Sequence, residues 1–270
     1  VVTLVTGRLS LFCCCLLWCI AVTAKADPVV SLEDQRAYYN EALSALDRND
    51  NSLYLKYRES LKDYPLFPYL SYVDINNRID TASLEEIEDF LIENPDLPQA
   101  GSLKLRWLKR LADHDEWILF LKYYDESLSF TELDCLFGQY LFNSSYQTSG
   151  IKLAEKLWMS GSPLPQACNP VFAEWEKAAG KPGTKKIWNR MRLAAESRNF
   201  NLVRELAKAH PALEKDSQLL ISIARNPARL SDLKLLDPKN PASADIAALG
   251  LLRLTRQDPL ITLGLLEHYA

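Results

Sequence analysis

Glycine, histidine and net positive charge are all scarce in this sequence. Its 270 residues include 9 glycines and 3 histidines, and the formal net charge is −4. The low glycine content, together with abundant Leu, Ala, Glu, Lys and Arg, favours helices joined by short turns. The acidic balance argues against a nucleic-acid-binding protein, which would carry a basic surface. With 48% apolar residues, the chain can bury a sizeable core.

Motifs of common catalytic and cofactor sites are also missing. The sequence has no H-E-x-x-H, no G-x-S-x-G, no phosphate-cradling glycine loop and no dinucleotide fingerprint. The three histidines, His114, His210 and His268, have no second ligand at helical spacing. We therefore expect neither a metal site nor a cofactor. His210 precedes a proline near an expected helix end, where a cation interacts favourably with the helix dipole.

Acidic residues cluster at the start of one expected helix. They are Glu85, Glu86, Glu88 and Asp89. Carboxylates in a first helical turn complement the positive end of the helix and face water. Catalytic carboxylate pairs would additionally need a cleft. A structural role is therefore the expectation for this cluster.

The first 26 residues have the pattern of a secretory signal peptide. Arg8 supplies the positive charge, an apolar run covers 9–24, and Ala24-Lys25-Ala26 is a small-x-small cleavage site. The run is shorter than the roughly 20 residues of a spanning helix, so a retained membrane anchor is the weaker alternative. The pattern predicts a periplasmic mature chain, 27–270, without a membrane span.

Removal of that segment leaves two cysteines, Cys135 and Cys168. In an oxidising compartment an isolated pair suggests a disulfide. Closing this loop would restrict the unfolded chain by about 3.7 kcal/mol in the loop-entropy model. Two buried free thiols are the alternative. The absence of C-x-x-C spacing argues against a redox-active pair.

Helical periodicity covers almost every stretch after Ser31. One apolar face, for example, combines Leu103, Trp107, Leu108 and Leu111. Ser83-x-x-Glu86 and Ser129-x-x-Glu132 are capping boxes that begin helices. Gly161 and Gly180 suit a left-handed residue after a helix. Because the residue before proline avoids the helical region, turns are predicted at Asn94-Pro95, Asn169-Pro170, Asn226-Pro227 and Asn240-Pro241.

These signals predict a dozen or more helices of roughly 10 to 17 residues joined by short loops. Short loops make consecutive helices antiparallel neighbours. We therefore expect an all-α superhelical solenoid of antiparallel helix hairpins, in one continuous domain. Its clearest unit is 191–203. A helix beginning at Pro259 has no polar cap, so the chain is expected to continue beyond Ala270.

Aromatic residues gather between Tyr64 and Tyr72 in the segment YPLFPYLSY. Aromatic faces can stack on sugars, and they also pack between helices. Both interpretations stay open, with helix packing the commoner one.

Several segments resemble the N-terminal helical domain of the large soluble lytic murein transglycosylases. They are Leu61–Leu70, Lys156–Gly161, the stretch from Gln166 through Phe172 to Trp175, and Arg190–Ala194. They occur in order between about Ser31 and Asp258. The resemblance implies a ring-shaped superhelix, incomplete in this chain, followed by a linker and a lysozyme-like domain. It also implies pairing of Cys135 with Cys168, which fall where the family has cysteines.

In that family the lysozyme-like domain cleaves the β-1,4 bond between N-acetylmuramic acid and N-acetylglucosamine. It leaves a 1,6-anhydromuramoyl end, with one glutamic acid as acid and then base and no cofactor. That glutamate lies in Glu-Ser, followed by a Gly-Leu-Met-Gln-like segment. No such segment follows Glu59-Ser60, Glu126-Ser127 or Glu196-Ser197. The resemblance therefore implies no catalytic residue here.

Two functions follow from these patterns. The resemblance implies that the chain places peptidoglycan glycan strands for a catalytic domain and is inactive alone. The alternative is a free-standing periplasmic helical-repeat module that binds a protein on its concave face.

Overall fold

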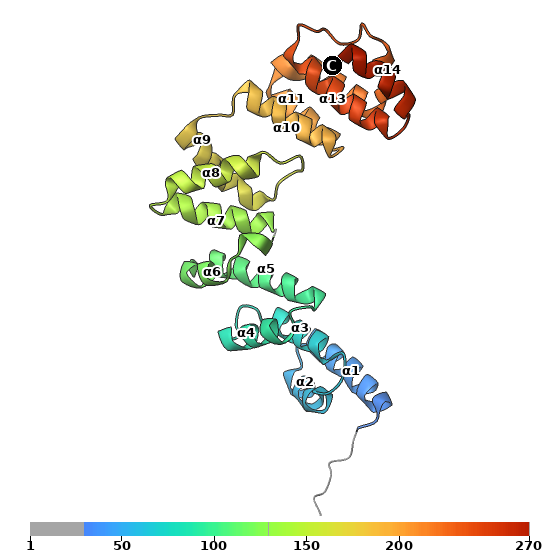
Figure 1. Cartoon of the computed structure of the whole chain (residues 1–270). Helices are drawn as coiled ribbons and strands as arrows, with labels where there is room; N and C mark the ends of the chain where they lie inside the picture. The colour runs from blue at the N-terminus through green and yellow to red at the C-terminus, as the bar shows by residue number, and fades with distance from the viewer. Residues whose placement is uncertain (1–29, 129, 270) are drawn as a thin grey trace, which may run out of the picture. The chain divides into compact units, whose positions relative to one another are not determined.

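The computed structural model describes residues 30–128 and 130–269, which contain fourteen α-helices and no β-strand (Figure 1). The predicted all-α class is thus confirmed. The predicted signal peptide, 1–26, lies outside the described residues. No helix in the described part is long and apolar enough to span a membrane. The helices are α1 (Leu32–Asp47), α2 (Asn51–Arg58), α3 (Phe67–Asn77), α4 (Leu84–Glu93), α5 (Pro98–Asp113), α6 (Trp117–Tyr123), α7 (Thr131–Asn143), α8 (Gln147–Trp158), α9 (Asn169–Ala179), α10 (Thr184–Glu196), α11 (Phe200–Ala209), α12 (Glu214–Arg225), α13 (Pro241–Thr255) and α14 (Pro259–Tyr269).

The chain divides into two compact units, which meet in the sequence between Val73 and Asp74. This division is not predicted from the sequence. In the first unit, α1 and α2 pack as a hairpin. Its core consists of Ala42, Ala45, Leu46, Tyr54, Leu61, Tyr64 and Leu70.

In the second unit, helices pack mainly against the next helix in the chain. Contacts join α7 to α8, α8 to α9, and then each consecutive pair from α10 to α14. Helices two apart also touch, as α7 does α9 and α10 does α12. This pattern is the stack of helix hairpins that short loops predict. The predicted unit 191–203 spans the turn between α10 and α11, which pack together as a hairpin.

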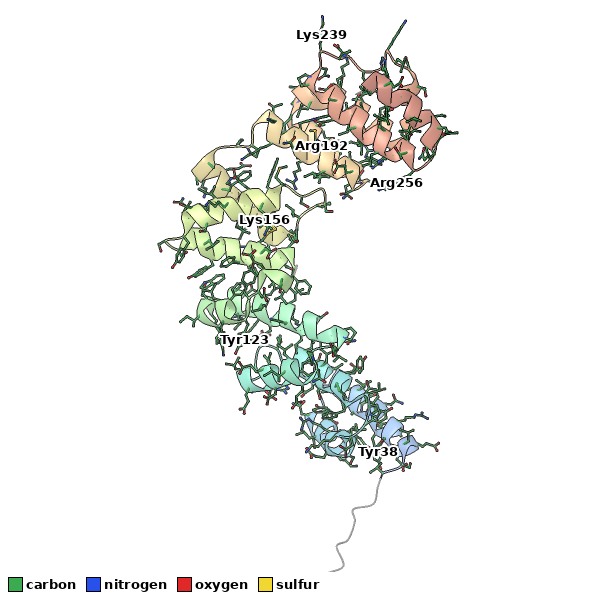
Figure 2. The ribbon with its side chains drawn as sticks, in the orientation of Figure 1. Tyr38, Tyr123, Lys156, Arg192, Lys239 and Arg256 are labelled. Carbon is green, nitrogen blue, oxygen red and sulfur yellow. A yellow bond between two sulfur atoms is a disulfide. The ribbon has the colours of Figure 1, made fainter. Side chains whose placement is uncertain are left out.

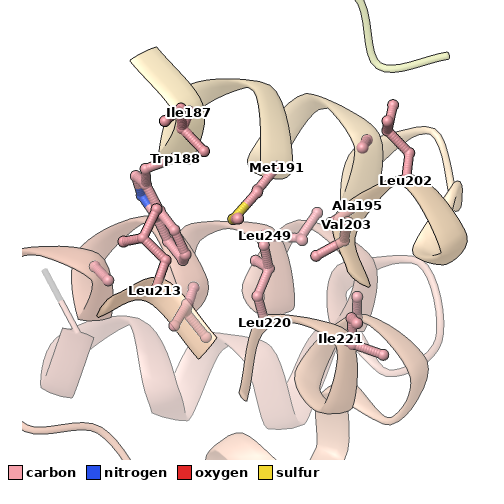
Figure 3. Packing of buried hydrophobic residues seen from close by; sticks show 14 of the residues in the cluster. Ile187, Trp188, Met191, Ala195, Leu202, Val203, Leu213, Leu220, Ile221 and Leu249 are labelled. Atoms are coloured by element: carbon pink, nitrogen blue, oxygen red, sulfur yellow. The ribbon is translucent and has the colours of Figure 1, made fainter. Parts of the chain in front are cut away.

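Apolar side chains of α10 belong to the large core cluster of the second unit (Figure 3). Ile187, Trp188 and Met191 are buried there, together with Leu220 of α12 and Leu249 of α13. Burying such side chains is the main source of stability in a helical stack.

Two hydrogen bonds also join α10 to α13. The Trp188 indole N–H donates to Asp245 Oδ2 on α13 at 2.8 Å. The Arg192 guanidinium donates to the other oxygen of the same carboxylate at 2.7 Å. Asp245 therefore satisfies two polar groups of α10, which fixes how α13 lies against it.

The two predicted helix-ending glycines behave differently. Gly180 follows α9 with φ 82°, as predicted, whereas Gly161 does not have a positive φ. A Cβ at Gly161 would lie 2.4 Å from the backbone oxygen of Leu193. The prediction of a left-handed residue is therefore wrong at Gly161, where glycine permits two backbone segments to approach closely.

Other local predictions are partly confirmed. The capping box at Ser83 and Glu86 is present at the start of α4, while Ser129 lies outside the described residues. The turn predicted at Asn169 is wrong, because this residue begins α9 with φ −59° and ψ −45°. Proline at the second helical position needs no N–H bond there, so α9 accommodates Pro170. The other three predicted Asn-Pro turns lie at helix boundaries. Asn94 and Asn226 directly follow α4 and α12, and Asn240 directly precedes α13.

Candidate functional site

A disulfide ties α7 to the segment that leads into α9. It joins Cys135 to Cys168, whose Cα atoms are 4.8 Å apart (Figure 2). Both residues are fully buried. Gln139 Nε2 donates to the carbonyl oxygen of Ala167 at 2.8 Å, one residue before Cys168. The covalent and polar links together hold the α7–α8 hairpin against α9.

The aromatic segment at Tyr64 lies in the first unit. Tyr64 is buried, and its ring centroid is 5.5 Å from that of Tyr39. Burial raises the pKa of the Tyr39 phenol. The Arg58 guanidinium lies over the Phe67 ring at 5.7 Å. These contacts agree with the helix-packing interpretation for Tyr64 and Phe67.

A second group of aromatic residues lies in the second unit, on α6, on α7 and at Tyr124, which directly follows α6. The sequence patterns do not predict this group. Five rings contact one another in a closed circuit, with centroid distances between 4.8 and 6.4 Å. We call them the aromatic band: Trp117, Phe120, Tyr124, Phe137 and Tyr140. Phe120 is fully buried, and the other four are half-buried.

Neighbouring side chains hold the aromatic band in position. The Tyr124 hydroxyl donates to Asp134 at 2.7 Å. Burial, and then this hydrogen bond, raise the pKa of Tyr124. Tyr123, labelled in Figure 2, packs on Trp107 of α5 with centroids 4.8 Å apart.

An open hollow lies beside the aromatic band. It has a volume of about 350 Å³ and is lined by residues 115–119, among them Trp117 and Ile118. Ile118 is 88% exposed. Half-exposed rings beside a hollow form a surface on which the apolar face of a sugar can stack.

Two residues of the acidic cluster on α4, Glu86 and Glu88, make contacts of the predicted structural kind. Glu86 completes the capping box and accepts from Arg78 at 2.8 Å. These bonds, chiefly the one from Arg78, lower the pKa of Glu86 to about 2. Glu88 pairs with Lys122 at 3.2 Å.

The three histidines lie at or near helix ends. His114 follows α5, His210 follows α11, and His268 lies in the last turn of α14. The predicted helix-end position of His210 is confirmed. Among the described residues, no three His, Cys, Asp or Glu side chains form a group that could hold a metal ion.

The Glu-Ser pairs fall at separate places. Glu59 pairs with Lys62, Glu126 with Lys156 and Glu196 with Arg192. The hydrogen bond from Lys62 is the main cause that lowers the pKa of Glu59. A catalytic acid needs the opposite shift, a pKa raised towards the working pH.

Comparison with known proteins gives related sequences, although no protein-family model matches. The soluble lytic murein transglycosylase of Escherichia coli K12 is 31% identical over 94% of this chain and 39% of its own length. That of Salmonella typhimurium LT2 is 29% identical over 87% of this chain and 36% of its own length. The chain thus spans about two fifths of the length of these curated relatives.

Solved structures that resemble this chain are also lytic transglycosylases. An inactive mutant of the lytic transglycosylase Slt from Pseudomonas aeruginosa is 44% identical, with a TM-score of 0.71 over 86% of this chain and 38% of that one. The 70 kDa soluble lytic transglycosylase of E. coli is 29% identical, with a TM-score of 0.60. The match covers 89% of this chain and 39% of that one. The chain is a homologue of the soluble lytic murein transglycosylases. The matched region of these transglycosylases is all-α, which agrees with the predicted superhelical class.

Proposed function

We propose that this chain is the N-terminal helical portion of a periplasmic lytic transglycosylase and that it positions peptidoglycan glycan strands. The catalytic domain of the longer protein would cleave the bond between N-acetylmuramic acid and N-acetylglucosamine and leave a 1,6-anhydro end. The observation that carries this proposal is a match over 94% of the chain to relatives of which the chain spans 39%. One relative was also solved in complex with bulgecin A.

The aromatic band supports a positioning role. Trp117 and Tyr140 are half-buried, with ring centroids 5.4 Å apart. Rings already held by their neighbours lose little conformational entropy when a sugar stacks on them. Hydroxyl-bearing tyrosines at the edge of such a surface can also hydrogen-bond a glycan.

The missing catalytic motif supports the proposal that another domain carries the chemistry. No Gly-Leu-Met-Gln-like segment follows Glu59-Ser60, Glu126-Ser127 or Glu196-Ser197. Cleavage of the glycosidic bond needs a carboxylic acid whose raised pKa lets it protonate the leaving oxygen. We therefore propose that the chain alone binds glycan without cleaving it.

Sedimentation with purified peptidoglycan sacculi tests this function. The chain is expected to co-sediment and to release no anhydromuropeptides. Trp117→Ala with Tyr140→Ala should reduce binding at least several-fold. The matched control is Tyr38→Ala with Tyr57→Ala, a half-buried pair stacked at 5.1 Å in the first unit, which should leave binding unchanged.

Two results would contradict the proposal. Release of anhydromuropeptides by the purified chain would locate chemistry within it. Failure to sediment with sacculi, together with stoichiometric binding of one protein partner, would favour the alternative of a free-standing helical-repeat module.

A further inference from the structure

Arginines gather where three helices of the second unit end. A pocket of about 400 Å³ lies at the C-terminal ends of α10, α12 and α13. Its lining comprises Glu196, Arg198, Phe200, Ala224, Arg225, Arg253, Arg256 and Gln257. Four positive charges thus face one negative charge, on a chain whose formal net charge is −4. The local excess is opposite in sign to the whole chain.

The surface continues into a second, adjoining pocket. This one has a volume of about 260 Å³ and shares Arg198, Phe200 and Arg225 with the first. It adds Arg204, whose guanidinium donates to Asn201 at 2.6 Å. We call the two pockets together the arginine groove.

Helix-end compensation explains one of these arginines. Helix C-termini carry partial negative charge and unpaired carbonyl oxygens, which cations satisfy. Arg253 does this, since it donates to the carbonyl oxygens of Ala195, Glu196 and Ala224. Arg253 is therefore a structural residue in the lining of the groove.

The other three arginines of the larger pocket also lie near helix C-termini, where a positive charge favours the helix dipole, but they differ from Arg253 because, within the described residues, they bond none of the helix-end carbonyl oxygens. Arg198, Arg225 and Arg256 are exposed, and within the described residues they form no ion pair and donate no side-chain hydrogen bond. The Arg225 guanidinium lies over the Phe200 ring at 5.0 Å, which orients it and leaves its N–H groups available. The single carboxylate of the pocket belongs to Glu196. Its Oε1 atom lies 3.9 Å from Nε of Arg192, a residue of the same helix that does not line the pocket.

The positive charges of the groove repel one another, and Glu196 offsets only part of this repulsion at Arg253. Burial, and then the charges of Arg198 and Arg256, lower the pKa of the Arg253 guanidinium. A bound anion would relieve this repulsion. Guanidinium groups donate two parallel hydrogen bonds to a carboxylate or a phosphate, which makes clustered arginines suited to such ligands.

We propose that the arginine groove is a binding site for an oxyanionic ligand that carries more than one carboxylate or phosphate group. Arg225 and Arg256, the latter labelled in Figure 2, contact the ligand, and Arg253 keeps the groove in shape. The proposal does not depend on the glycan-positioning role. The aromatic band suits the apolar face of a sugar, whereas this groove suits charged groups.

Calorimetric titration of the purified chain at low ionic strength tests the site. Citrate serves as the carboxylate probe and pyrophosphate as the phosphate probe. At least one is expected to bind with one-to-one stoichiometry, and its affinity should fall as salt is added. Binding of citrate alone would assign a carboxylate ligand, and binding of pyrophosphate alone a phosphate ligand.

Matched variants separate a site from a general charge effect. Arg225→Gln with Arg256→Gln should weaken binding about tenfold or more. Arg36→Gln with Arg48→Gln removes the same charge from exposed positions of the first unit and should change affinity less than twofold. Circular dichroism checks folding, and the single variant Arg256→Gln should still weaken binding if the double variant fails to fold. The proposal is overturned if neither probe binds, or if both double variants weaken binding equally.

Discussion

Arg253 on α13 donates a hydrogen bond to the carbonyl oxygen of Ala195 on α10 at 2.6 Å, across 58 residues of sequence. The same guanidinium also reaches the carbonyl oxygen of Ala224 on α12. One side chain of α13 therefore donates hydrogen bonds to carbonyl oxygens at the C-terminal ends of both α10 and α12. Buried carbonyl groups left without a partner cost free energy, so this residue should matter for stability.

Arg253→Ala should lower the free energy of unfolding by about 2–4 kcal/mol, because it leaves carbonyl oxygens of α10 and α12 unpaired. Urea unfolding followed by circular dichroism measures the change. The control is Arg256→Ala, an exposed position on the same helix end, which should change stability by less than about 0.5 kcal/mol. Equal effects of both substitutions would show that the bonds from Arg253 are not stabilising.

Gly161→Ala should destabilise the second unit, because the added Cβ would lie 2.4 Å from the Leu193 oxygen. The backbone must move apart, at a cost of about 1–3 kcal/mol, measurable by urea unfolding. Gly264→Ala is the matched control. It lies inside α14 with open space around its Cβ, so alanine should stabilise by about 0.5–1 kcal/mol. A neutral Gly161→Ala would contradict the close approach of these segments.

Breaking the bond between Cys135 and Cys168 should lower stability by about 3–4 kcal/mol, since it closes a loop with a sequence separation of 33. The comparison is unfolding of the chain with and without reductant, and of the Cys135→Ala, Cys168→Ala double variant. Intact mass after alkylation without reductant should show Cys135 and Cys168 unmodified, because a disulfide has no free thiol to react. Alkylation of both would mean that the pair is reduced.

Glu86 makes a pH-dependent contribution to stability. Its pKa in the folded chain is about 2, lowered mainly by the hydrogen bond from Arg78. Because the folded pKa lies below the ordinary value of 4.5, the contribution is present above about pH 4.5 and disappears as the pH falls towards 2. Since the side chain is 44% exposed, solvent screening reduces the contribution to about 1 kcal/mol.

Glu86→Gln keeps a capping side chain and removes the charge, so it isolates this effect. The variant should be less stable than the wild type at pH 7, and the difference should shrink by pH 2.5. Glu85→Gln, an exposed neighbour on α4, should show no such difference. A Glu86→Gln difference that is constant with pH would argue against the pairing with Arg78.

Local sequence signals predict the helices well and the surfaces poorly. The Ser83 capping box depends on residues only three apart, and it is present as predicted. Gly161 differs, because its neighbour Leu193 is more than thirty residues away and no local pattern reveals that approach. Periodicity predicts which face of α5 is buried, since Leu103 and Trp107 lie on one side of a single helix.

The two candidate binding surfaces need the tertiary structure for the same reason. The arginine groove combines the ends of three helices, so Arg198 and Arg256 meet only after folding. The aromatic band combines Trp117 with Tyr140 from a different helix. The spacing of Trp117, Phe120 and Tyr124 is a helical signal that could have located three of its five members.

The coding sequence beyond Ala270 tests the central claim most directly. If this chain is the helical portion of a lytic transglycosylase, the reading frame should continue into a lysozyme-like domain. That domain should contain Glu-Ser followed by a Gly-Leu-Met-Gln-like segment. A stop codon immediately after Ala270, or a continuation without that motif, would contradict the account.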